Sequence, residues 1–65
     1  MNYNIKLFAA IKRSGLSQKE FARIIGEQPS TVSRVINGWF NLNDHGKAKY
    51  AHFLGCDVEE IFPDA

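Results

Sequence analysis

Two short helical patterns joined by a glycine turn constrain the fold of this 65-residue chain more than any other feature. The first pattern covers residues 17–25 and is followed by Gly26, which suits the left-handed conformation that turns a chain sharply at a helix end. The second begins at Pro29, because the amide that proline lacks would be unpaired in the first turn of a helix, and it ends at Asn37-Gly38.

Capping residues define where the first of these helices begins. Ser17 is a favourable N-cap, and Glu20 lies three residues later, where its carboxylate can accept a hydrogen bond from the Ser17 amide. This spacing predicts a capping box. Leu16 before the cap and Phe21 after it have the spacing of a hydrophobic staple, which fixes the angle at which the chain enters the helix.

Each predicted helix has one apolar face at helical spacing. The two faces are formed by Phe21, Ala22 and Ile25 and by Val32, Val35 and Ile36. Ala22 lies four residues before Gly26, where a small side chain allows two steeply crossing helices to approach each other. The other sides of the second helix carry Ser30, Thr31, Ser33 and Arg34. A short helix that is polar and basic on its outer face suits the major groove of DNA.

The remaining sequence predicts three more helices and no strand. An amphipathic helix is expected over residues 4–14, a further one from an Asn43 or Asp44 cap through Ala48, Ala51 and Leu54 to Gly55, and a short one that starts at Asp57. In the last helix Asp57 and Glu60 repeat the capping-box spacing, and Cys56 and Ile61 repeat the staple. No segment alternates with period two. We therefore predict an all-α protein with a single domain over residues 1–65 and a small core.

Charge is distributed unevenly along the chain. Residues 1–56 contain eight lysines and arginines against three carboxylates, a net charge of +5, and four further carboxylates bring the total to +1. The acidic end is expected to face away from a polyanion and the helix-turn-helix half to face it. Without the motif, these cations would be interpreted as an ordinary solvated surface.

Enzymatic and metal-binding functions are not supported by the sequence. His45 and His52 are seven residues apart and His52 and Cys56 are four apart, but neither pair has the further ligands that would complete a zinc site. No glycine-rich phosphate loop and no nucleophile with a paired base is present. We predict no metal, no cofactor and no catalysis. The single cysteine suits a reducing cytoplasm, and residues 4–14 are too short and too charged for a signal peptide or a membrane span.

The motif resembles a known family. Residues 16–22 (LSQKEFA), Gly26 and residues 30–38 (STVSRVING) are similar to the helix-turn-helix proteins typified by phage repressors and Cro, which are lambda-repressor-like and XRE-type. The likeness extends more weakly to residues 51–55 and 58–62, so it covers residues 7–62. It implies a compact five-helix domain, with the helix-turn-helix at helices 2 and 3, that binds operator DNA, commonly as a dimer. It also implies a transcriptional regulator, such as a repressor, of phage or mobile-element type.

The resemblance also implies which residues read DNA bases. Gln28, Pro29, Ser30 and Arg34 fall at the family positions that approach base edges. Arginine can form two hydrogen bonds to guanine, and glutamine can do the same to adenine. Thr31 adds a hydroxyl and a methyl group that suits contact with thymine. A surface salt bridge is the alternative role for Arg34.

Other residues are expected to contact phosphates. Gln18 resembles the family's glutamine at the start of the first motif helix, where the helix dipole favours an anion. The alternative for Ser17 and Gln18 is capping alone. The predicted phosphate contacts are Ser17, Gln18, Lys19, Ser33, Asn37 and Asn41, and Arg23, Lys47 and Lys49 are expected to add further phosphate neutralisation.

Three residues depart from the family pattern. Glu27 occupies the turn, where the family often has an apolar residue, and it places a negative charge close to the DNA; it either helps to cap the next helix or rejects some sequences by repulsion. Gln28 is a poorer N-cap than serine or threonine, and Ile11 stands where the family often has arginine. These departures concern affinity and target more than fold.

Adjacent aromatic residues after the second helix indicate a further contact. Of Trp39 and Phe40, one is expected to fold back into the core with Leu42 and the other to remain exposed as a dimer or partner contact, with both packed over the core as the alternative. Phe53 and Phe62 are further candidates for such a contact. These aromatics also favour a second function, a protein-binding module of antirepressor or antitoxin type with weak DNA affinity.

Overall fold

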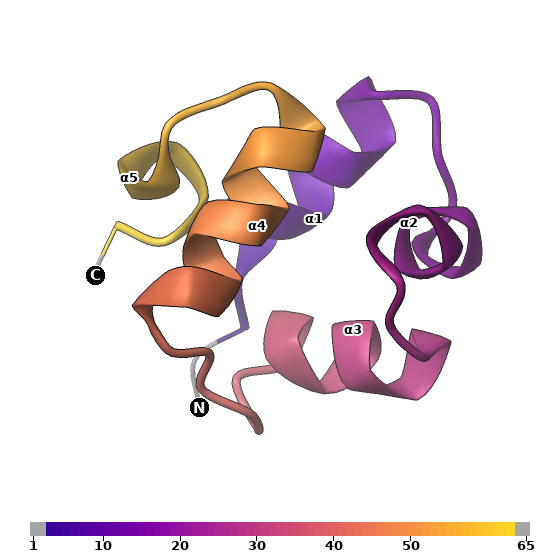
Figure 1. Cartoon of the computed structure of the whole chain (residues 1–65), viewed down its shortest axis with the longest axis horizontal. Coiled ribbons are helices and arrows are strands. Elements are labelled where there is room, and N and C mark those ends of the chain that lie inside the picture. The colour runs from indigo at the N-terminus through magenta and orange to yellow at the C-terminus, as the bar shows by residue number, and fades with distance from the viewer. Residues whose placement is uncertain (1–2, 64–65) are drawn as a thin grey trace.

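The computed structural model describes residues 3–63, which form five α-helices in chain order (Figure 1). The helices are α1 (Ile5–Arg13), α2 (Gln18–Ile25), α3 (Pro29–Ile36), α4 (Asp44–Leu54) and α5 (Val58–Ile61). No strand occurs within residues 3–63, so the predicted all-α class and five-helix order are confirmed. Residues 1–2 and 64–65 of the predicted single domain, with the charge of Asp64, lie outside the described residues.

The predicted capping interactions are present at the starts of α2 and α4. The Glu20 amide donates to the Ser17 hydroxyl oxygen at 3.1 Å and the Ser17 amide donates to the Glu20 carboxylate at 2.9 Å, which completes the capping box of α2. The Gly46 amide donates to the Asn43 side chain at 2.8 Å, so Asn43 rather than Asp44 caps α4. These bonds satisfy amides that have no partner within their own helix.

One apolar core is shared by all five helices. Its buried members are Leu7, Ala10, Ile11, Phe21, Ala22, Ile25, Val32, Val35, Ile36, Tyr50, Ala51 and Ile61. Tyr50 is the largest of them, and its ring contacts Phe21 edge-on with centroids 5.3 Å apart and Phe62 with centroids 6.1 Å apart. Helix α4 turns Tyr50 and Ala51 inward, and Ala48 lies on its exposed side.

Asn4 joins three helices, which the sequence did not indicate. Its side-chain oxygen caps α1 by accepting from the Leu7 amide at 2.9 Å, and its side-chain amide donates to the Ile61 carbonyl at 2.6 Å. Its backbone amide donates to the Ile36 carbonyl, also at 2.6 Å. Asn4 thus connects the start of α1 to the ends of α3 and α5.

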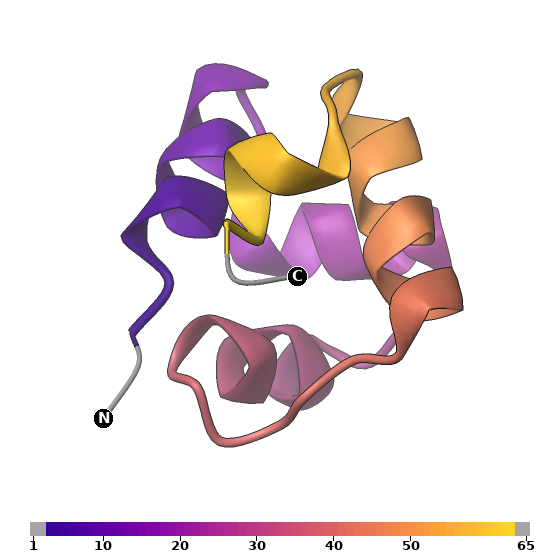
Figure 2. The same ribbon diagram turned by 90° about the vertical axis from the view of Figure 1, so that its left-hand side faces the viewer.

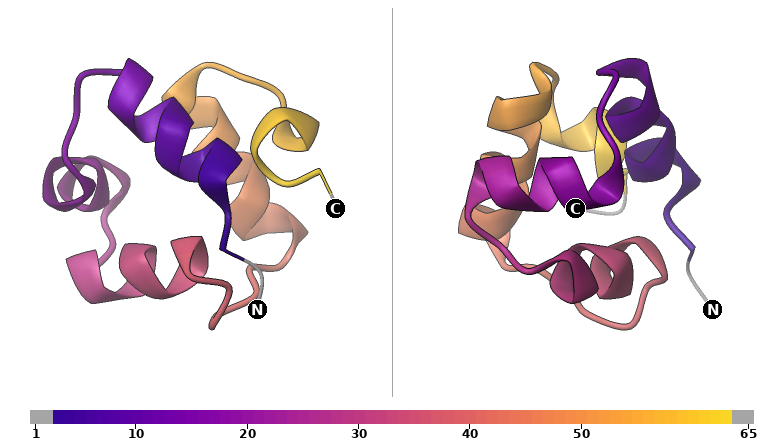
Figure 3. Two further views of the ribbon diagram at one scale, coloured as in Figure 1. Left: turned by 180° about the vertical axis from the view of Figure 1, so that it is seen from behind. Right: turned by 90° about the vertical axis from the view of Figure 1, so that its right-hand side faces the viewer.

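The helices are arranged so that α3 forms one edge of the molecule. In Figure 1 α2 is seen end-on while α3 lies across the lower edge, so the two helices cross steeply. Helix α3 packs against α2 and α1, and α5 packs against α1 and α4. The two views in Figure 3 and the view in Figure 2 keep α3 at the lower edge, with no other helix beneath it. The short acidic α5 lies beside α1 in the upper part of Figure 2, away from the lower side of α3.

Asn4 should contribute more to stability than an ordinary N-cap. Asn4→Ala removes both the cap of α1 and the bond to Ile61, so we expect a loss of about 2 kcal/mol in the free energy of unfolding. Asn43→Ala is the matched control, because it removes only a cap, and should cost about 1 kcal/mol. Urea unfolding followed by circular dichroism measures both. Equal losses would contradict the role of Asn4 as a tertiary connection.

Because of Tyr50, the free energy of unfolding should depend on pH in the alkaline range. Burial, and secondarily the charge of Glu27, raise the pKa of Tyr50 to about 12. The unfolded chain ionises this group near pH 10, so the folded state binds more protons and its stability falls as pH rises from about 10 toward 12. Tyr50→Phe should reduce this dependence.

The same variant tests the buried hydroxyl at neutral pH. The Tyr50 hydroxyl is buried without a hydrogen-bond partner among residues 3–63, so its removal should leave stability unchanged or raise it by up to about 1 kcal/mol. Urea unfolding of both proteins between pH 7 and 11 is the measurement. A Phe variant that is clearly less stable at pH 7 would show that the hydroxyl is satisfied.

Candidate nucleic-acid interface

The turn between α2 and α3 has the predicted geometry. Gly26 adopts a left-handed φ of +76°, and the amide that follows, that of Glu27, donates to the Ala22 carbonyl at 2.8 Å. Ala22 is completely buried, and Pro29 is the first residue of α3. The glycine and the small side chain therefore allow α3 to cross α2 at close range, with its apolar face on the core.

The outer side of α3 is open. Ser30 and Arg34 are exposed, while Thr31 and Ser33 are half-buried. The helix contains no acidic residue, and Arg34 has no ion-pair partner within residues 3–63. The salt-bridge alternative for Arg34 is therefore not observed. The hydroxyls and the guanidinium form a polar surface that the rest of the described chain leaves accessible.

The start of α3 is capped weakly. Gln28 occupies the N-cap with extended backbone angles, but its side chain makes no capping hydrogen bond. Gln28 and Pro29 are both exposed and precede Ser30 directly. The departure from a serine or threonine cap thus leaves the glutamine amide available to a ligand at the same end of the helix.

The N-terminal end of α2 adds polar groups to this surface, and it also carries the negative charge of Glu20, which would repel DNA. Lys19 is exposed and Gln18 is half-buried. Ser17 uses its hydroxyl oxygen as an acceptor for the Glu20 amide, which leaves the hydroxyl proton available to donate. The hydrogen bond from the Ser17 amide holds the pKa of Glu20 below its usual value, so this exposed carboxylate is ionised at neutral pH. Capping by Ser17 is observed, and a phosphate contact remains a prediction.

The end of α3 is occupied by Asn37. Its side-chain amide donates to the Ser33 carbonyl at 2.8 Å and to the Ser33 hydroxyl at 3.3 Å, so Asn37 caps the helix in this conformation. The Asn37 side-chain nitrogen is therefore engaged by Ser33 in this structure, and a phosphate contact of Asn37 stays a prediction. Asn41, in the loop that follows, is exposed.

Both aromatic residues after α3 are exposed, so the expectation that one of them folds back is wrong. Trp39 is 69% exposed and Phe40 46% exposed, and only Leu42 from this loop packs against the core. Gly38 has a left-handed φ of +79°, and the Trp39 amide donates to the Arg34 carbonyl at 2.9 Å, so the start of the loop is tied to the exposed end of α3 rather than to the core. Elsewhere, Phe53 is exposed, whereas Phe62 packs on the core beside Tyr50.

An ion pair links the turn to α4, and the sequence analysis missed it. The Lys49 ammonium lies 2.8 Å from the Glu27 carboxylate, and both side chains are about one-third exposed. Lys49 is thus directed to Glu27, and the Lys47 ammonium lies over the Phe62 ring, 5.8 Å from its centroid. The only signal in the sequence was a turn carboxylate where the family often has an apolar residue. A partner 22 residues away cannot be found from spacing.

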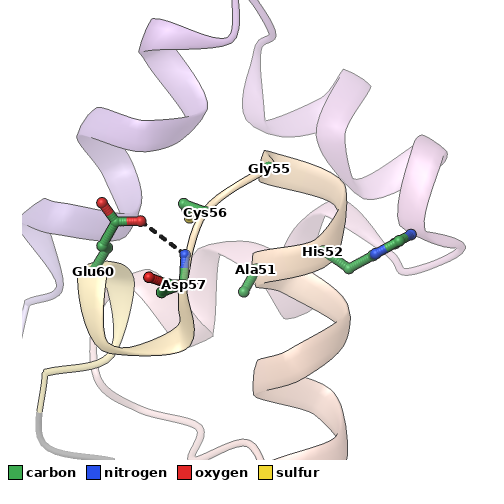
Figure 4. A pocket seen from close by; sticks show the side chains of 6 residues that line it. All are labelled: Ala51, His52, Gly55, Cys56, Asp57 and Glu60. Atoms are coloured by element: carbon green, nitrogen blue, oxygen red, sulfur yellow. Dashed lines mark hydrogen bonds between the residues drawn. The ribbon is translucent and has the colours of Figure 1, made fainter.

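The two histidines and the cysteine that the sequence analysis considered as metal ligands lie in and just after α4. Figure 4 shows Cys56 close to Asp57 and Glu60, with His52 pointing away from them. Glu60 accepts a hydrogen bond from the Asp57 amide at 2.8 Å. Burial raises the pKa of the Cys56 thiol, so it stays protonated at neutral pH. Within residues 3–63, no group of three or more potential metal-ligating side chains gathers in space.

Comparison with known proteins identifies the family. A family model described as helix-turn-helix matches residues 7–43, which include α1, α2 and α3. The chain belongs to the helix-turn-helix family of the XRE and lambda-repressor-like type. This places it among DNA-binding helix-turn-helix regulators, a family that is not typically enzymatic. Neither the curated proteins nor the solved structures contain a significant match. None of the helices within residues 3–63 is long and apolar enough to span a membrane.

Proposed function

We propose that this protein is a sequence-specific transcriptional regulator, of repressor or Cro type, that inserts α3 into the major groove of operator DNA. The observation that carries the proposal is the outer side of α3, which is exposed, polar and free of carboxylates on a helix-turn-helix scaffold. A helix in this position reads bases with the residues near its N-terminal end, while neighbouring elements bind the backbone.

The proposed roles follow the position of each side chain. Gln28 and Pro29 lead the helix into the groove, Arg34 bonds guanine, and Ser30 and Thr31 contact bases at the entering end. The proposed phosphate contacts come from α2, from α3 and from the loop after it, through Ser17, Gln18, Lys19, Ser33, Asn37 and Asn41. A regulator of this kind has to reach DNA, which agrees with the expected cytoplasmic location. The proposed DNA contacts use side chains alone and call for no cofactor.

A homodimer is the proposed DNA-bound form. One α3 helix covers a single half-site, and two half-sites about 34 Å apart fit a two-fold symmetric pair. The exposed Trp39 and Phe40 are the proposed contact between copies, because adjacent exposed aromatics favour a partner surface. Phe53 is a second exposed candidate, and the packing of Phe62 on Tyr50 makes it the weakest of the four.

One observation favours a second function. Exposure of both Trp39 and Phe40, rather than one, also suits a protein-binding module of antirepressor or antitoxin type with weak DNA affinity. Salt dependence separates the two functions. A DNA regulator loses about 0.9 log units of affinity per log unit of salt for each phosphate contacted, whereas binding to a protein through aromatic side chains changes little.

Replacement of Arg34 tests base reading. After selection of bound sites from a random DNA pool, Arg34→Ala should weaken binding to the selected duplex by about 1–3 kcal/mol and relax the base preference at one position. Arg13→Ala is the control, because Arg13 lies at the end of α1 and has no proposed role. Fluorescence anisotropy at fixed salt gives the affinities. Unchanged binding and preference in Arg34→Ala would remove Arg34 from the proposed site.

Replacement of Trp39 tests the dimer contact. Trp39→Ser should leave the fold intact and weaken assembly of two copies on a full operator roughly tenfold, with little effect on a half-site. Ile24→Ser is the control, since Ile24 is an exposed apolar residue on α2 without a proposed contact. Sedimentation of the protein with each duplex reports the stoichiometry. An undiminished two-copy complex in Trp39→Ser would place the contact elsewhere.

A further inference from the structure

The turn between α2 and α3 holds a carboxylate beside the end of α3 that the proposed function directs into the major groove. Glu27 precedes the N-cap of α3 by one residue, and Gln28 and Pro29, which follow it, are exposed. A free negative charge at this position would repel the phosphates on either side of the groove.

Lys49 reaches this carboxylate from α4. Its ammonium donates to the Glu27 carboxylate at 2.8 Å, which is the only ion pair within residues 3–63. The next residue on α4 is Tyr50, whose buried ring contacts Phe21 of α2. This packing fixes the helix that carries Lys49 against the helix that leads into the turn.

We propose that Lys49 is a positioning residue for DNA binding, which acts by cancelling the charge of Glu27 and holding that side chain against α4. The inference rests on the proposed function and deepens it, because it assigns to Lys49 an effect on affinity without a contact to DNA. It replaces the expectation from the sequence that Lys49 neutralises a phosphate directly.

The contribution of the Lys49–Glu27 ion pair to folding stability is too small to explain its presence. Both side chains are about one-third exposed, and exposed ion pairs contribute little to folding because water and salt screen them. The charge of Glu27 is nevertheless felt locally, since it adds to the burial that raises the pKa of Tyr50. Phosphates brought close to the turn would experience the same charge once Lys49 was removed.

A double-mutant cycle tests the proposal. Affinity for a duplex taken from the selected pool is measured by fluorescence anisotropy for the wild type, Lys49→Gln, Glu27→Gln and the double variant, over a series of salt concentrations. Lys49→Gln should bind about tenfold more weakly at low salt, because Glu27 is then uncompensated. The double variant should bind within about twofold of Glu27→Gln, since Lys49 has no effect once the carboxylate is gone.

Controls separate this effect from loss of fold or of total charge. Lys12→Gln removes the same charge from α1, where the Lys12 ammonium lies over the Phe8 ring, and should change affinity less than Lys49→Gln. Lys49→Arg keeps the charge and should restore binding to within about twofold of the wild type. Thermal melts by circular dichroism verify that each variant is folded at the temperature of the assay.

The remaining outcomes overturn the proposal. An equal loss on removing Lys49 with and without Glu27, together with a salt slope lowered by about 0.9, would identify Lys49 as a direct phosphate contact. No loss in Lys49→Gln would leave the pair without any role in binding. If the wild type bound no duplex at all, the proposed function would fail, and this inference would fail with it. In the two outcomes above the wild type binds normally, so they overturn only the role of Lys49.

Discussion

The close crossing of α2 and α3 is the constraint on which the rest of the structure depends. Helix α3 has only eight residues, too few to be stable alone, so its conformation relies on the burial of Val32, Val35 and Ile36. Those side chains reach the core because Ala22 is small and Gly26 turns the chain with a positive φ. With its apolar face held in this way, α3 leaves its polar side at the edge of the molecule.

The same arrangement decides which charged side chains lie near α3. The acidic residues of α5 lie with α1 and α4, away from the lower side of α3 (Figure 2). Two carboxylates beside the turn and the start of α2, those of Glu20 and Glu27, are engaged within the protein. Glu20 accepts the amide hydrogen bond of the α2 capping box, and Glu27 pairs with Lys49. The net charge of the chain therefore says less about DNA binding than the location and the partners of each charge.

Local patterns in the sequence predicted the helices, because caps, glycines and apolar spacing act over three or four residues. The Ser17–Glu20 box, the Gly26 turn and the buried faces of α2 and α3 are confirmed for this reason. Features that depend on contacts across the chain were missed or wrong. Asn4 bonds Ile61, 57 residues away, and Lys49 pairs with Glu27, 22 residues away.

The errors in burial have the same origin. The exposure of both Trp39 and Phe40 depends on how the loop leaves the end of α3, which the order of residues does not reveal. The roles of individual side chains in reading DNA remain predictions, because exposure makes a contact feasible without identifying its partner.

The most direct test of the central claim is a titration of the ¹⁵N-labelled protein with a selected operator duplex, followed by amide chemical shifts. If α3 enters the groove, the largest changes will fall on the amides of residues 28 and 30–34 and of the start of α2, and amides of α5 will change little. Changes centred on α5 or on the end of α4, with residues 28–34 unaffected, would contradict the account.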